Sequence, residues 1–256
     1  MKRIIAFTLL LLIVTFTSTL VHAVTLTFST LDYPGATGNY PAGTYVTGSS
    51  GNTTVGYMYS DASQHGFLYD GKNWSNLDYP GASQTFPSSI GGNTIVGFYN
   101  GGSEQYHGFS YDGKTWSSLS YPGADDTYVT DRSGNTIVGY YSSSGPAHGF
   151  SYDGTTWTTI DSPFGYDTHI TDINGHTIVG YYEIGEARYG FSYDGTKWTR
   201  LAYSGALHTY ITGISGNLLI GNIDIKNESS GTYVSRAFLY DGTTWSIFEY
   251  PGAELT

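Results

Sequence analysis

The chain has 256 residues, and 10 Lys and Arg against 21 Asp and Glu give it a formal net charge of −11 at pH 7. An acidic chain without basic clusters is a poor match for nucleic acid or anionic membranes, so neither partner is expected. The chain has no cysteine, which excludes a disulfide framework. Charged residues make up 12% and aromatic residues 16%, with 35 glycines, which excludes a disordered chain and indicates a Gly-punctuated all-β protein.

The first 23 residues have the pattern of a secretory signal peptide. Lys2 and Arg3 precede an apolar run over 4–16, and a small-x-small cleavage signal ends at Ala23. The run is shorter than the ~20 apolar residues of a membrane span, and a retained N-terminal anchor is the alternative. Cleavage would remove two basic residues and leave a charge of 8 − 21 = −13. We therefore expect a protein that is secreted to the extracellular space or periplasm, with no membrane contact after cleavage.

A repeat of 41–47 residues fills the rest of the chain. The five tryptophans are spaced 42, 41, 41 and 47 residues apart, and each lies four residues after the aspartate of an Asp-Gly pair. A Val-Gly or Ile-Gly pair recurs with the same period, and so does a Tyr-Pro-Gly-Ala segment or a variant of it. A fixed period of this size is typical of solenoids and propellers.

Each repeat is predicted to form four short strands. In the third repeat they are expected over 127–131, 136–141, 148–153 and 156–160, with a tight Asp-Gly turn between the last two. Five such units predict an all-β, five-bladed β-propeller as a single domain over 24–256. We expect an N-terminal strand over 25–36 and repeats over about 40–82, 83–124, 125–165, 166–206 and 207–253. Because the fourth strand has six copies and the others five, either terminus could complete the last blade.

The repeated pattern His-Gly-Phe-x-Tyr-Asp-Gly-x-x-Trp, preceded by Val-Gly-Tyr-Tyr, resembles the bacterial extracellular HAF-type repeats. Their name reflects a His-Ala-Phe triplet at this position. Here the triplets are His65-Gly66-Phe67, His107-Gly108-Phe109, His148-Gly149-Phe150, Tyr189-Gly190-Phe191 and Arg236-Ala237-Phe238. The resemblance covers all five repeats and implies a secreted repeat protein, but it brings no catalytic residue.

His148 and Asp153 lie at opposite ends of one predicted strand, roughly 16 Å apart at ~3.3 Å per residue, so they cannot share a proton or a metal. Asp153 is interpreted as a turn residue. His65, His107 and His148 hold one position in three repeats, where a three-His metal site is the minor alternative to local hydrogen bonding. No metal and no cofactor are predicted.

The first strand of each blade normally lines a propeller channel, so its side chains are the candidate ligand-binding residues. The equivalent positions are Tyr45, Phe86, Tyr128, His169 and Tyr210. Five such rings around a polar mouth would suit stacking against sugars, and the competing interpretation is packing between blades. Asp131 and Asp172 form the candidate acidic pair. They could act as an acid and a nucleophile or base for glycoside hydrolysis, or they could cap the nearby turns.

The loops between the second and third strands differ most between repeats and are expected to carry specificity. The leading hypothesis is a secreted, non-enzymatic, monomeric protein that binds extracellular carbohydrate or cell-surface material. The alternatives are a glycan-active hydrolase or lyase that uses channel carboxylates, and a structural or protein-adhesion module with a surface protein as its partner.

Overall fold

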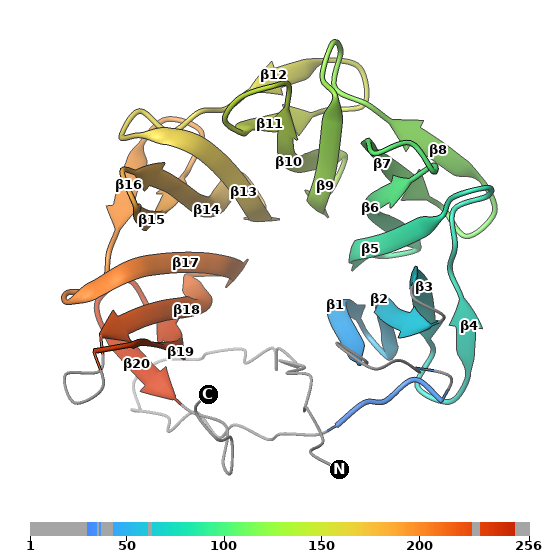
Figure 1. The fold of residues 1–256 in the computed structure, drawn as a ribbon, viewed down its shortest axis with the longest axis horizontal. Helices are drawn as coiled ribbons and strands as arrows, with labels where there is room; N and C mark the ends of the chain where they lie inside the picture. The colour runs from blue at the N-terminus through green and yellow to red at the C-terminus, as the bar shows by residue number, and fades with distance from the viewer. Residues whose placement is uncertain (1–29, 35, 37–42, 61–62, 227–230, 249–256) are drawn as a thin grey trace.

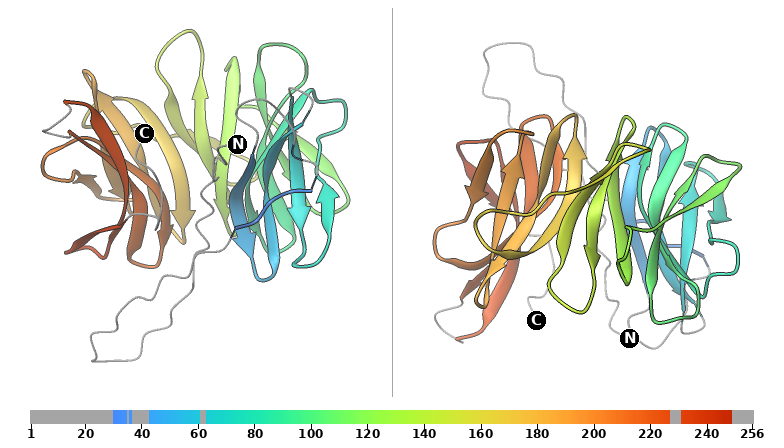
Figure 2. Two further views of the ribbon diagram at one scale, coloured as in Figure 1. Left: turned by 60° about the horizontal axis from the view of Figure 1, so that its bottom comes forward. Right: turned by 90° about the horizontal axis from the view of Figure 1, so that it is seen from above.

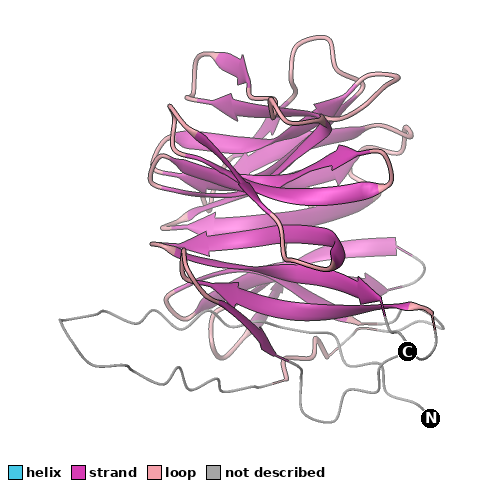
Figure 3. Ribbon diagram, turned by 90° about the vertical axis from the view of Figure 1, so that its left-hand side faces the viewer, coloured by secondary structure: helices cyan, strands magenta, loops and turns pink. Residues whose placement is uncertain are grey.

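The computed structural model describes residues 30–34, 36, 43–60, 63–226 and 231–248, and every regular element in these ranges is a β-strand (Figure 3). The strands fall into five sets of four. The first set is β1 (Thr44–Ser50), β2 (Thr53–Ser60), β3 (Ser63–Tyr69) and β4 (Trp74–Asn76); the second is β5 (Gln84–Gly91), β6 (Thr94–Asn100), β7 (Tyr106–Tyr111) and β8 (Trp116–Leu119). The third is β9 (Asp126–Ser133), β10 (Thr136–Ser142), β11 (His148–Tyr152) and β12 (Trp157–Thr159). The fourth is β13 (Tyr166–Asn174), β14 (Thr177–Ile184), β15 (Ala187–Tyr193) and β16 (Trp198–Leu201), and the fifth is β17 (Ala206–Ser215), β18 (Leu218–Lys226), β19 (Tyr233–Tyr240) and β20 (Trp245–Phe248).

Within each set the strands pair antiparallel in chain order. The sets stand around a common axis with β1, β5, β9, β13 and β17 innermost (Figures 1 and 2). The fourth and fifth sets are also joined by a parallel bridge between Arg188 and His208. This is an all-β, propeller-like fold made of four-stranded sheets. The four strands expected for the third repeat match β9 to β12 within two residues at each end.

This topology places two kinds of loop at one end of the sets. In an antiparallel set, the loop from the second to the third strand leaves at the same end as the connection to the next set. We call this end the loop-bearing face. The hairpin loops from the first to the second strand, and from the third to the fourth, lie at the opposite end.

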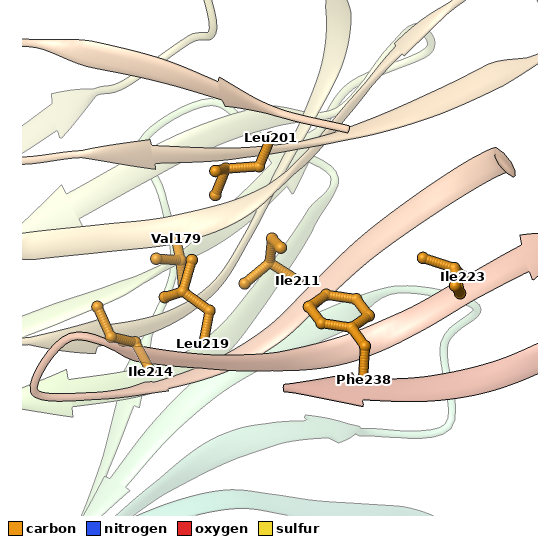
Figure 4. Packing of buried hydrophobic residues seen from close by; sticks show 7 residues of the cluster. All are labelled: Val179, Leu201, Ile211, Ile214, Leu219, Ile223 and Phe238. Carbon is orange, nitrogen blue, oxygen red and sulfur yellow. The ribbon is translucent and has the colours of Figure 1, made fainter. Parts of the chain in front are cut away.

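The hydrophobic core consists of layers between neighbouring sets. One layer joins Val179 of the fourth set to residues of the fifth, among them Ile211, Leu219 and Phe238 (Figure 4). Phe150 lies in another layer with Val96 and Val129 and has no exposed surface. Burial of such a side chain stabilises the fold by ~1.5–3 kcal/mol. The repeated Phe of the third strand packs against the preceding set in the same way in the second, fourth and fifth sets.

A β-bulge interrupts each innermost strand at the same repeat position. In β9 the register slips around Thr130, and the same slip occurs in the other four sets. The Thr130 hydroxyl donates to the carbonyl of Ile170 in the next set at 3.0 Å and lies 3.3 Å from that of Val138 in its own set. Thr47 and Thr171 make the equivalent bonds across their own junctions. The extra residue thus links one set to the next.

The two terminal copies of the fourth strand have different positions. β20 pairs with β19, so the fourth strand of the fifth set comes from the C-terminal end. Of the predicted N-terminal strand over 25–36, only 30–34 and 36 are described, and none of them is in a strand. Tyr33 packs edge-on against Trp74 of the first set, and its hydroxyl donates to Asn76 at 2.9 Å. Residues 1–23, the predicted signal peptide, lie outside the described residues. No helix in the described part of the chain is long and apolar enough to cross a membrane.

Candidate functional site

The five predicted ring residues lie near the loop-bearing face, and four of them stack on an aromatic ring of the neighbouring second strand. Cross-strand register brings each pair together, as between Tyr128 and Tyr140. The stacked pairs, with centroid distances of 4.8 or 4.9 Å, are Tyr45–Tyr57, Phe86–Phe98, Tyr128–Tyr140 and His169–Tyr181. Tyr210 has Asn222 as its register partner instead.

Contacts between sets join these pairs into one chain of rings. Each second-strand ring contacts the ring residue of the next set, with centroid distances of 4.4 to 5.2 Å: Tyr57–Phe86, Phe98–Tyr128, Tyr140–His169 and Tyr181–Tyr210. We call these nine residues the aromatic girdle. Its half-buried rings pack between sets, as the competing interpretation proposed, and their role in ligand binding stays a prediction. The sequence analysis did not identify the second-strand members of the girdle, although an aromatic residue follows each Val-Gly pair and marks their positions.

Burial disfavours the charged forms of five girdle residues. It raises the pKa of Tyr57, Tyr128 and Tyr181 to about 12, and it raises the pKa of Tyr140 further. Burial also lowers the pKa of His169, against the pull of nearby Asp167 and Glu183. Its Nδ1 is buried and has no hydrogen-bond partner among the described residues. The girdle therefore presents hydroxyl groups and a neutral imidazole at physiological pH.

A charged cluster lies where the fourth and fifth sets meet. The Arg188 guanidinium forms an ion pair with Glu183 and donates to the Tyr210 hydroxyl at 2.8 Å. It also lies over the Tyr210 ring, 5.6 Å from the centroid. These two hydrogen bonds raise the pKa of Arg188, so the side chain is permanently cationic. Glu183 and Arg188 lie in β14 and β15, on either side of the loop between the second and third strands, and the sequence analysis did not single out either charge.

Asp131 and Asp172 come together at a joint between sets. Asp131 Oδ2 accepts from the Ile173 amide at 3.0 Å, and Asp172 Oδ2 accepts from the Ile214 amide at 2.7 Å. Each carboxylate thereby holds the backbone of the following set. Burial, a hydrogen bond with the Asp131 side chain and its charge raise the pKa of Asp172 well above the ordinary value. Both carboxylates are engaged in holding neighbouring sets together.

The repeated histidines make local hydrogen bonds on the third strands. The Nδ1 atom of His148 lies 2.8 Å from Asp161, whose other oxygen accepts from the Gly149 amide. His65 and Asp78 repeat this arrangement. His107 faces Ser120 instead, at 3.1 Å. No group of three or more His, Asp or Glu side chains in the described part of the chain could hold a metal ion.

Asp153 organises its turn, as predicted. Its Oδ1 accepts from the amides of Thr155 and Thr156 at 2.8 and 2.7 Å, and Gly154 has a φ of 97°. These backbone hydrogen bonds lower the pKa of Asp153. The loop runs over 153–156, longer than the expected Asp-Gly pair, because Thr155 and Thr156 complete it.

No family model matches the chain, and no curated protein matches it. Among solved structures it is similar to the β-propeller domain of the Trilobed protease from Pyrococcus furiosus, which is described as having an open velcro topology. The match has a TM-score of 0.53 and 12% identity, and it covers 78% of this chain but only 64% of that one.

The chain is also similar to the Aleuria aurantia lectin. Its complex with Fucα1-6GlcNAc gives a TM-score of 0.51 and 15% identity over 80% of this chain and 76% of that one. A second structure of that lectin, described as a six-bladed β-propeller with a novel fucose recognition mode, gives 0.50 and 14% over 77% and 73%. At these identities the likeness shows the fold alone, which is that of β-propellers.

Proposed function

We propose that the protein is a secreted, non-enzymatic, five-bladed β-propeller of HAF-type repeats that binds extracellular carbohydrate or cell-surface material through its loop-bearing face. The signal-like N-terminal segment over 1–23 supports export. The five sets of four strands support five blades. The lectin among the similar structures is consistent with carbohydrate as a ligand class for this fold.

The placement of exposed hydrophobic side chains carries the proposal. Four large hydrophobic side chains are exposed in the described part of the chain: Phe164, Tyr166, Ile184 and Tyr233. All four lie in or beside loops of the loop-bearing face, and all belong to the fourth and fifth sets or to the connection that enters the fourth. Exposed aromatic rings beside hydrogen-bonding groups are the surface that a sugar uses, because its C–H face stacks and its hydroxyls bond.

The acidic pair supports binding without turnover. Each of Asp131 and Asp172 accepts a backbone amide from the following set, and the two side chains share a hydrogen bond. Inverting and retaining glycosidases instead hold two carboxyl groups ~5–9.5 Å apart, on either side of the scissile bond. A pair in direct contact leaves no room for a sugar ring between its members.

The test is a glycan array probed with the purified protein, followed by calorimetry on the best hits. We expect saccharide binding that survives the double substitution of Asp131→Asn and Asp172→Asn, with no released product from the bound glycan. Product formation that the double variant abolishes would establish a hydrolase or lyase. If the protein binds no glycan on the array but captures one surface protein, it is an adhesion module.

A further inference from the structure

A row of three side chains crosses the fourth set at its loop-bearing end. Tyr166 of β13 is the register partner of Glu183 in β14, which is the partner of Arg188 in β15. Directly opposed residues of antiparallel strands project from the same side of the sheet. Tyr166, Glu183 and Arg188 therefore stand side by side on one face.

This combination occurs in one repeat only. At the position of Arg188 the other repeats have Gln64, Tyr106, Ala147 and Ser235, and at the position of Glu183 they have Tyr59, Asn100, Ser142 and Asp224. The first-strand residues that pair with the Glu183 position are Gln84, Asp126 and His208 in the second, third and fifth sets. Residues that pack every junction recur in every repeat. A combination of residues found in one repeat only therefore points to a role other than packing.

The ring of Tyr166 is held in a position where a sugar ring can stack on it. Its side chain is 51% exposed, although its hydroxyl donates to the Gly185 carbonyl at 3.2 Å. This bond fixes the ring across the turn after β14 while much of the ring stays in contact with water. The next residue, Asp167, has a φ of 59°, a conformation that costs ~1–3 kcal/mol in a non-glycine residue. Its carboxylate offsets part of this cost by accepting from the Ala147 amide at 2.6 Å.

Arg188 and Glu183 supply hydrogen bonds beside this ring. The Arg188 side chain is 42% exposed, and its contacts with Glu183 and Tyr210 leave further guanidinium N–H groups free to donate. Glu183 retains acceptor positions on its carboxylate. A fixed donor fork beside an acceptor matches two adjacent hydroxyl groups, each of which both donates and accepts.

The charges around the row select against anions. Glu183 and Asp167 both act electrostatically on His169, together with the single cation Arg188. Burial keeps His169 itself neutral. Two carboxylates thus oppose one cation around His169, and Glu186 in the turn after β14 adds a further negative charge, in a chain of net charge −11. A carboxylate or sulfate on the ligand would meet repulsion here, whereas a neutral ligand would not.

We propose that the junction of the fourth and fifth sets is a subsite for a neutral saccharide, stacked on Tyr166 and bound through adjacent hydroxyls to Arg188 and Glu183. This subsite rests on the proposed carbohydrate-binding function and locates it. The aromatic girdle beneath it, represented here by Tyr181 and Tyr210, then serves as the support that holds Arg188 in place.

The experiment compares single variants by calorimetry on neutral oligosaccharides and on their uronic-acid or sulfated counterparts. Tyr166→Ala and Arg188→Ala should each weaken neutral binding about 10- to 100-fold, the effect of losing a stacked ring or a charged hydrogen bond. Glu183→Gln removes one negative charge, so it should narrow the difference between neutral and acidic ligands. Tyr166 is exposed, so its variant tests the subsite without endangering the fold.

Two matched controls lie outside the row. Tyr193→Ala removes a tyrosine whose hydroxyl also donates to a glycine carbonyl, that of Gly195 at 2.8 Å, but at the opposite end of the fourth set from the loop-bearing face. Arg200→Ala removes an arginine that lies over Tyr189 on the outer strands. Both controls should bind like the unmodified protein. Neutral binding that all these variants retain, or a preference for acidic glycans, would overturn the subsite and leave the proposed function standing. A protein that binds no glycan at all would overturn both.

Discussion

Asp172 shows how one side chain can hold the fold together and also make it sensitive to pH. Its carboxylate accepts the Ile214 amide of the next set at 2.7 Å and lies against Asp131. Two carboxylates in contact at a buried joint cannot both be charged without a large cost, so one of them retains a proton. The turn aspartates have the opposite bias, because backbone amides lower the pKa of Asp153 and of its four equivalents.

We predict that Asp172→Asn stabilises the protein above neutral pH. The folded-state pKa of Asp172 is raised, so as the pH rises from about 4 the unfolded chain releases a proton that the folded chain retains. The free energy of unfolding contributed by this group therefore falls with rising pH. Asparagine can still accept from Ile214 and can donate to Asp131 without titrating. The gain at pH 8 should be about 1 kcal/mol or more in urea unfolding.

The control for this prediction is Asp125→Asn, which makes the same substitution in an exposed connection. It should leave the shape of the stability profile between pH 4 and 8 unchanged. An Asp172→Asn profile that falls as steeply with pH as that of the unmodified protein would show that Asp172 is ionised in the fold.

At the scale of elements, the repeated Val-Gly pair and the bulge are two halves of one joint. A Cβ atom on Gly139 would lie 2.0 Å from the carbonyl oxygen of Tyr128 in the neighbouring strand, and Gly180 has the same relation to His169. Such a contact is with backbone, so no rotamer change relieves it. The glycine lets β9 approach β10 just before the bulge turns Thr130 toward the next set.

We therefore predict that Gly139→Ala destabilises the protein by about 3 kcal/mol or more, at or above the upper end of usual overpacking costs. Gly145→Ala is the matched control, because its nearest contact would be Ser143 at 3.7 Å. The midpoints of urea unfolding, with tryptophan fluorescence as the signal, compare the two. Equal midpoints would show that the strands can separate without cost at this joint.

Most of the strands and turns could be predicted from the sequence, but the candidate site could be predicted only in part. The Asp153 turn and the strands of the third repeat follow from local residue chemistry and from the repeat period. The row of Tyr166, Glu183 and Arg188 depends on register across three strands and on a second irregularity in β13, between Tyr166 and His169. A bulge shifts the register without changing the residue pattern, so spacing alone could not align these side chains.

At the scale of the whole molecule, each set is formed by consecutive residues, and neighbouring sets are held together by layers of hydrophobic side chains, the bulge threonines and the acidic joint. The second, third and fourth sets each have a neighbour on both sides (Figure 1). The first and fifth sets stand at the two ends of this arc, and β20 comes from the same stretch of chain as β17 to β19. No strand in the described residues is exchanged between these two sets. In repeat architectures stability is approximately the sum of each unit and its interfaces, so a unit with fewer interfaces opens first.

We accordingly predict that the first and fifth sets exchange their amide hydrogens faster than the middle three. The comparison should use the innermost strands β1, β5, β9, β13 and β17, since they share one place in the repeat. β1 has fewer buried residues than the other four, as expected for a strand with one neighbouring set. Hydrogen exchange with mass spectrometry should show β9 protected longest, because it lies in the central set, and β1 and β17 opening at a lower free energy than global unfolding. Equal protection in all five strands would instead mean that the first and fifth sets meet across an interface as strong as the four internal ones, because only a closed ring gives every set two equivalent neighbours.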